Sequence, residues 1–314
     1  MSESKIAVYG ALAANVAIAA TKFTVAALSG SSAMLSEGIH STVDAGNGLL
    51  LLVGLHRSQR GASIEHPFGH GKELYFWSLI VAVLIFGVGG GVSAYEGVLH
   101  VIDPVPLDDP KWSYIVLGAS ALFEGASLAV ALRTFMAEKG DRPFFEALHA
   151  SKDPATYTVI AEDSAALAGL AIAALGVWVS HAFDLPVVDG AASIAIGLLL
   201  AGVAVLLIRE SRGLLIGEGI RPETTRAVRA RAAADPRVRE VGVPLSMYIG
   251  PDEILLTLDL EFKPNVPAGE VATAIRDIER SIRAEFPKIR RIYLEATTLD
   301  GPRRALPAQP TAPT

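Results

Sequence analysis

Six long apolar segments follow one another through the first two thirds of the chain. They lie near Ile6–Leu28, Ala33–Leu55, Leu74–Leu99, Trp112–Phe135, Thr156–His181 and Val187–Ile208. A helix needs about 20 apolar residues to cross a bilayer, and each segment approaches or reaches that length. Any one segment has an alternative as a soluble-core helix, but six in succession are hard to bury in a globule of 314 residues. The pattern predicts six transmembrane helices in a lipid bilayer.

Lys and Arg are distributed unevenly over the connections between these segments. The connections that follow the even-numbered segments are basic: Arg57, Arg60, Lys72, Arg133, Lys139, Arg142, Lys152, Arg209 and Arg212. The other connections carry only Lys111. Because basic loops stay on the cytoplasmic side, both termini are expected to be cytoplasmic. We expect a multi-pass protein of the plasma (inner) membrane.

The chain changes character at about Ser211, where the long apolar runs stop. Of its 27 Lys and Arg residues, 14 fall between Arg212 and Arg291, and acidic residues roughly match them. Alternating and helical patterns predict a soluble α-β-β-α-β unit of ferredoxin-like type, with its elements at Pro222–Ala234, Val238–Ile249, Glu253–Phe262, Pro267–Phe286 and Ile289–Ala296. The expected organisation is a transmembrane domain over 1–210, a cytoplasmic α+β dimerisation domain over 211–299 and a disordered tail over 300–314.

Composition excludes several classes of protein. The chain has no cysteine, which excludes disulfides and thiolate metal sites. A net charge of −6 without a basic tract gives no indication of a nucleic-acid partner. Neither a His-Glu-x-x-His nor a Gly-x-Ser-x-Gly motif is present, so a membrane hydrolase is disfavoured and we expect no enzymatic activity.

The second apolar segment contains a cluster of polar residues. At about 100° per residue, Glu37, His40, Asp44 and Asn47 fall within a sector of roughly 80° on one helix face. Ionisable groups at membrane depth cost about 2.5–3.5 kcal/mol each on insertion scales, so they normally face an interior path. His40 and Asp44, one turn apart, offer a nitrogen and an oxygen ligand to a divalent cation. The alternative is a histidine that is hydrogen-bonded within the protein core.

Two motifs and the domain order resemble a known family. The second segment reads Ser-Ser-Ala-Met-Leu-Ser-Glu-Gly-Ile-His-Ser-x-x-Asp over Ser31–Asp44, and the next connection reads His-Pro-Phe-Gly-His-Gly-Lys over His66–Lys72. With six spans and a C-terminal α-β-β-α-β unit, the chain resembles the cation diffusion facilitators along nearly its whole length. It is most similar to the branch that contains human mitochondrial zinc transporter nine, through the motifs at Ser36–Ser41, Phe123–Ala126, Lys152–Pro154 and Glu162–Ala166.

The resemblance implies a transport activity. Members of this family are expected to be homodimers that export zinc or a similar divalent cation from the cytoplasm in exchange for protons. The expected partners are the metal ion, protons, the lipid bilayer and a second copy of the chain. No cofactor is implied beyond the transported cation.

The fifth segment departs from the family pattern. Most members carry a second His/Asp-x-x-x-Asp pair there, but here Ala166 follows Glu162 and Leu167 follows Asp163 at that spacing. Adjacent acids point about 100° apart on a helix, so we expect only one of them to meet the second segment directly. We favour Asp163 as the third ligand, with Glu162 as a fourth ligand or proton holder and Asn47 as a further oxygen donor. The alternative places both acids in a helix N-terminal turn at the membrane surface.

Other polar residues are candidates for the proton pathway and for a second ion. Glu37, Glu96 and Glu124 are candidates for the proton pathway. Glu96 and Glu124 lie in apolar surroundings, and the alternative for each is a pairing with backbone or a position near the membrane interface. His66 and His70 are candidates for a second metal site in the loop. The alternative for this pair is a purely structural role, because Ser63 stands where relatives have a helping Asp.

The residues leave the transported metal and one competing function open. A histidine ligand favours zinc, while manganese and iron(II) accept more oxygen-rich sites. The missing second ligand pair also permits a degenerate regulatory membrane protein without transport. Proton exchange would follow from the need to deprotonate the ligands, with His40 and Glu162 as carriers.

Overall fold

The structure is a computed structural model that describes residues 3–105, 110–140, 143–144, 147–148 and 152–297. The chain divides into two compact units, Met1–Ile216 and Gly217–Thr314. The first unit ends at Ile216 and not at 210, because its last helix continues without a break to that residue. The expected disordered tail, 300–314, lies outside the described residues.

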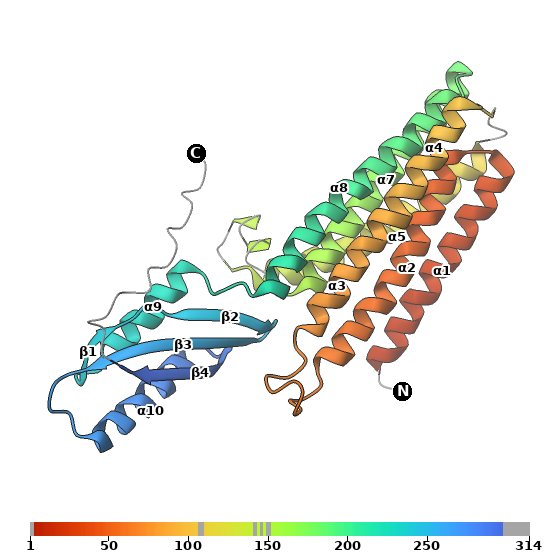
Figure 1. Cartoon of the computed structure of the whole chain (residues 1–314). Coiled ribbons are helices and arrows are strands. Elements are labelled where there is room, and N and C mark those ends of the chain that lie inside the picture. The colour runs from red at the N-terminus through yellow and green to blue at the C-terminus, as the bar shows by residue number, and fades with distance from the viewer. Residues whose placement is uncertain (1–2, 106–109, 141–142, 145–146, 149–151, 298–314) are drawn as a thin grey trace, which may run out of the picture. The chain divides into compact units, whose positions relative to one another are not determined.

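Long helices lying side by side form the first unit (Figure 1). They are α1 (Glu3–Ser29), α2 (Ser32–Ser58), α3 (Glu73–Leu84), α4 (Ser93–Ile102), α5 (Lys111–Glu138), α7 (Pro154–Phe183) and α8 (Val187–Ile216). A π-helical segment, η1 (Ile85–Val92), joins α3 to α4, so these three elements make one continuous rod.

Four helical stretches in the described part of the chain are apolar and long enough to cross a membrane. They are Glu73–Ile102, Lys111–Ala137, Thr156–Phe183 and Val187–Ile216, with mean hydropathies between 1.8 and 2.7. These stretches coincide with the third to sixth predicted segments. In α2, the ionisable residues interrupt the apolar run.

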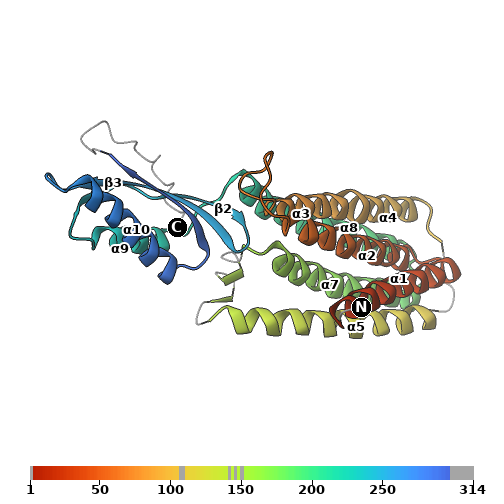
Figure 2. The same cartoon turned by 90° about the horizontal axis from the view of Figure 1, so that it is seen from below.

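The helices of the first unit pack into one connected bundle. Helix α1 contacts α2 and α5, and α7 contacts α2, α5 and α8. Elements α3, η1 and α4 pack along α8, and α2 contacts all four of these elements (Figure 2). Glycines allow the close approach of α4 to α8. A Cβ atom at Gly97 would lie 2.7 Å from the Gly190 carbonyl oxygen, so a larger residue would clash with backbone. The backbones of α4 and α8 are therefore in close contact at these glycines.

The second unit is a small mixed sheet with two helices. Its elements are α9 (Pro222–Ala233), β1 (Val238–Val241), β2 (Leu245–Gly250), β3 (Glu253–Phe262), α10 (Ala268–Glu285) and β4 (Ile289–Ala296). Strand β3 pairs antiparallel with β1 and β2 and parallel with β4. Since β2 and β4 both pair with Ile254–Thr257, they occupy opposite edges of β3.

The single strand predicted over Val238–Ile249 is two strands. Pairing stops over 242–244, where Pro244 has no N–H to donate and Gly242 donates to the Asp259 carbonyl at 2.8 Å. Alternate residues of β3 are buried, and this face packs against α9 and α10 through Val228, Ala232, Ile278 and Ile282. The apolar core of the unit lies between the sheet and these helices.

An ion pair in the second unit gives a testable pH dependence. The Arg237 guanidinium donates to both Asp235 carboxylate oxygens at 2.9 and 2.6 Å and lowers the pKa of Asp235 below its usual value. A lowered acid pKa contributes stability above the unfolded-state pKa of about 3.9, which is lost as pH falls through the folded-state value. We expect Asp235→Asn to reduce local stability by about 1 kcal/mol at pH 7.

Hydrogen exchange of the β3 amides in the full chain measures this effect. The difference between Asp235→Asn and the parent protein is expected to shrink as the pH is lowered below 4. Asp252→Asn is the matched control, because Asp252 forms an exposed pair with Lys288. A loss of protection that stays constant down to acid pH would contradict the assignment.

Candidate metal site

Helix α2 carries the predicted nitrogen and oxygen ligands on a face that points into the first unit. His40 Nδ1 lies 3.5 Å from Asp44 Oδ1, and the His40 side chain is only 2% exposed. Both ring nitrogens of His40 and the Oδ1 atom of Asp44 are buried without a hydrogen-bond partner. Buried polar atoms are normally satisfied, so these unpaired donor atoms require an explanation.

The start of α2 is fixed by a carboxylate on α8. Asp189 accepts from the Ser31 hydroxyl at 2.6 Å, from the Ser32 N–H and hydroxyl at 2.6 and 2.9 Å, and from the Ala33 N–H at 3.2 Å. Ser31 in turn accepts from the Met34 N–H. A buried anion at a helix N-terminus satisfies the free N–H groups there and interacts favourably with the helix dipole. This cap sets the position of α2, and with it that of His40 and Asp44.

Helix α7 brings both predicted acids to the interior, each toward a different neighbour. Glu162 Oε1 accepts from Asn47 Nδ2 of α2 at 2.8 Å. Asp163 accepts from the Ser127 hydroxyl of α5, and its Oδ2 atom is buried without a partner. Because α7 begins at Pro154, both acids lie well inside the helix and outside its first turn.

The remaining predicted acids separate into three environments. Glu124 of α5 is buried and interacts electrostatically with Asp44 and Asp163. Glu96 is half-buried on α4, which packs along α8. Glu37 forms a buried ion pair with Lys22 of α1. The sequence-based interpretation did not single out Lys22, although a lone Lys within an apolar segment was the signal for it.

The loop between α2 and α3 brings the two predicted histidines together. The rings of His66 and His70 are 4.4 Å apart between centroids, and His70 Nδ1 lies 3.1 Å from the Gly61 carbonyl oxygen. The Ser63 hydroxyl accepts from the His66 N–H, so Ser63 closes a turn here. The two histidines belong to this turn and do not lie on a helix.

The candidate ligands of α2 and α7 do not lie close enough together to surround one cation. Within residues 3–297, leaving aside the gaps in the description, no group of three or more His, Asp and Glu side chains lies close enough to hold a metal ion. The unpaired atoms of His40, Asp44, Asn47 and Asp163 nevertheless belong to α2 and α7, two helices that contact each other. A change in the α2–α7 contact would be needed to bring these atoms onto one cation.

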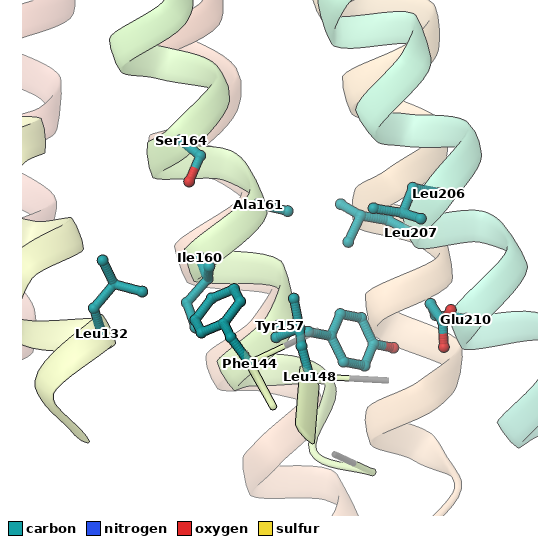
Figure 3. A pocket seen from close by; sticks show the side chains of 10 residues that line it. All are labelled: Leu132, Phe144, Leu148, Tyr157, Ile160, Ala161, Ser164, Leu206, Leu207 and Glu210. Carbon is teal, nitrogen blue, oxygen red and sulfur yellow. The ribbon is translucent and has the colours of Figure 1, made fainter. Parts of the chain in front are cut away.

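A separate cavity of about 410 Å³ lies between α5, α7 and α8 (Figure 3). Its lining is apolar except for Tyr157, Ser164 and Glu210. None of the candidate metal ligands lines it, so it is distinct from the site described above.

Comparison with known proteins decides the family. The family model described as the cation efflux transmembrane domain matches residues 8–216, which is the whole helical unit apart from its first few residues. The chain belongs to the cation efflux family. The resemblance inferred from Ser31–Asp44 and from the other motifs is thereby confirmed.

Relatives within the cation efflux family agree with this assignment. The chain is 33% identical over 248 residues to the mitochondrial proton-coupled zinc antiporter SLC30A9 of Homo sapiens, covering 78% of this chain and 44% of that protein. It is 34% identical over 261 residues to metal tolerance protein C4 of Arabidopsis thaliana, covering 82% and 57%. It is 27% identical over 294 residues to magnetosome protein MamM of Magnetospirillum gryphiswaldense, covering 90% and 83%.

These comparisons support divalent metal transport by a multi-pass membrane protein and correct one expectation. The match spans less than half the length of the vertebrate SLC30A9 proteins. The plasma-membrane assignment is wrong, because these relatives are mitochondrial proteins. The distribution of Lys and Arg orients the loops of a membrane protein but does not identify the membrane, which explains the error.

Proposed function

We propose that this cation efflux protein exchanges a divalent metal cation, zinc in the first instance, for protons. The cation would bind between α2 and α7. It would be exported from the side of the membrane that carries the soluble unit to the opposite side. His40, Asp44 and Asp163 would be its direct ligands. Glu162 and Asn47 would complete the site or stabilise its empty form.

The observation that carries this proposal is the set of buried donor atoms without partners. His40 contributes two ring nitrogens, and Asp44, Asn47 and Asp163 contribute one oxygen each. Leaving a buried polar group unsatisfied costs about 1–3 kcal/mol, so unpaired donor atoms on two contacting helices favour a ligand that would bind them. Nitrogen and carboxylate oxygen together match the ligand preference of zinc.

Proton coupling follows from the chemistry of the same ligands. A carboxylate or imidazole must lose its proton before it binds a metal, so metal binding releases protons and proton binding releases metal. Glu162 would be the proton holder, because it lies beside the proposed ligands at the α2–α7 contact and already has a partner in Asn47 in place of a metal. Glu124 is buried close enough to act on Asp44 and Asp163 and would extend the proton path.

The proposal includes six membrane spans and a homodimer. Helices α1 and α2 would span the bilayer with the four more apolar stretches, with the ionisable face of α2 turned inward. Helices of the bundle would move relative to one another, with a change at the α2–α7 contact, to expose the site on alternate sides. The soluble unit, with its ferredoxin-like α+β arrangement, would pair with that of a second copy.

Two points about the metal remain part of the proposal. The acids around His40 also suit manganese or iron(II), and raw affinity does not choose between these ions. A second metal at His66 and His70 would need water or a partner residue to complete its coordination. The two rings alone supply too few ligands for the four that zinc prefers.

The test is coupled flux in proteoliposomes that contain the full chain and a pH-sensitive dye. A zinc gradient is expected to drive proton movement in the opposite direction, and an imposed proton gradient is expected to drive zinc. Protein-free liposomes measure the leak. A regulatory protein without transport would bind zinc but move neither ion, and this result would overturn the proposal.

A further inference from the structure

A lysine in the middle of α1 lies among the residues around the proposed site. The Lys22 side chain is only 1% exposed, and its ammonium donates to Glu37 Oε2 at 3.0 Å and to Ser41 Oγ at 2.8 Å. Removing a charged lysine from water is costly unless it is paired, and here the pairing joins α1 to α2. The proposed transport chemistry makes no use of this residue.

The partner of this lysine has a second carboxylate oxygen without a hydrogen-bond partner. Glu37 lies one turn before His40 on α2 and is fully buried. Its second oxygen, Oε1, has no hydrogen-bond partner and lies against α7 at Gly169, where a Cβ atom would be only 2.6 Å away. A carboxylate oxygen is thus free at the junction of α1, α2 and α7.

The charges of this pair act on the proposed ligands. Both Lys22 and Glu37 interact electrostatically with His40 and with Asp44. Without Lys22, the site would gain one uncompensated carboxylate next to a histidine and several acids. A more oxygen-rich and more negative site favours harder cations such as manganese.

We propose that Lys22 determines metal specificity by holding Glu37 out of the ligand set and offsetting its charge. The ammonium acts as a fixed internal cation at the position where a fourth carboxylate would otherwise complete an oxygen-rich site. This inference rests on the proposed transport function and adds the residue that selects its substrate.

The experiment compares zinc and manganese binding and uptake by the full chain in proteoliposomes. Lys22→Met and Lys22→Gln are expected to raise manganese affinity relative to zinc by about tenfold, because both remove the ammonium charge that offsets Glu37. Lys22→Gln keeps a donor for Ser41 and Glu37 and provides a second variant if Lys22→Met does not fold. Lys22→Arg keeps the charge and is expected to keep the parental ratio.

A double variant separates specificity from simple structural pairing. Lys22→Met with Glu37→Gln removes both charges together and leaves no carboxylate to coordinate, so the parental zinc-to-manganese ratio is expected to return. A purely structural ion pair would lower the folded yield or the stability of the single variants and leave the ratio unchanged.

The outcomes distinguish this inference from the proposed function. If the parent protein moves no metal, transport itself is refuted. If the parent transports zinc while Lys22→Met and Lys22→Gln both keep its metal ratio, only the specificity role of Lys22 is overturned. A shifted ratio in Lys22→Arg would overturn it as well, because that variant retains the internal cation.

Discussion

Replacing Asp163 by asparagine is expected to weaken zinc binding by about 100-fold, and Asp44→Asn is expected to do the same, since each is proposed to bind the metal directly. Asp163 Oδ2 and Asp44 Oδ1 are both buried without a hydrogen-bond partner. An asparagine at either position removes the negative charge that stabilises the bound cation. Competition with a fluorescent zinc chelator measures the affinity.

Glu162→Gln is expected to reduce zinc affinity by about tenfold or less, because Glu162 already has a hydrogen-bond partner. A glutamine oxygen can still accept from Asn47 Nδ2, so the α2–α7 contact survives this substitution. The number of protons exchanged per zinc is expected to fall, since a glutamine cannot carry one. Separate effects on affinity and on proton stoichiometry would distinguish ligand from proton holder.

Ser164→Ala is the matched control on α7, because Ser164 is the next residue but lines the separate cavity. Its zinc affinity is expected to equal that of the parent protein. If Asp163→Asn binds zinc normally while Glu162→Gln loses binding, the two acids have exchanged roles. Glu162 would then be the direct metal ligand, and its hydrogen bond to Asn47 would be exchanged for the metal on binding.

The sequence predicted most of the helices because their signals are local. Apolar length predicted the boundaries of α5 and α7 to within a few residues, and alternation predicted β3. The break between β1 and β2 was missed because Pro244 lies inside an otherwise alternating run. A proline within an alternating run argues against one continuous strand, so Pro244 was a local signal for the break.

The sequence predicted the residues of the site better than their partners. The 3.6-residue period places His40 and Asp44 on one face of α2, and the structure places these side chains 3.5 Å apart. The period of a single helix says nothing about which helix lies opposite. The contacts of Asn47 with Glu162 and of Ser127 with Asp163 depend on the rotation of α7 within the bundle.

Two buried charged residues also show that a single sequence does not reveal which distant residue is the partner. Lys22 and Asp189 are single charged residues at the middle and at the start of apolar segments. Their partners lie 15 and about 157 positions away in the chain, distances at which no pattern in one sequence connects residues. A charge inside an apolar segment nevertheless predicts that a partner exists, and this rule alone would have identified both residues.

The second large expected effect concerns Asp189. Replacing it by alanine is expected to destabilise the helical unit by about 3 kcal/mol or more, because several buried donors at the start of α2 lose their acceptor together. Asp189 is fully buried and receives four hydrogen bonds from Ser31, Ser32 and Ala33. Thermal unfolding of the full chain in detergent, followed by circular dichroism, measures the loss.

The same substitution is expected to weaken zinc binding, although Asp189 is no ligand. The cap fixes where α2 begins, and His40 follows it by about two turns, so fraying of the first turn would loosen the ligand pair. Asp189→Asn keeps one acceptor oxygen and is expected to fall between the alanine variant and the parent protein in stability. Asp103→Ala, at the exposed end of α4, is the matched control and is expected to unfold like the parent. If Asp189→Ala unfolds at the parental temperature, its hydrogen bonds do not stabilise α2, and the position of His40 must then depend on the packing of α2 against α7 alone.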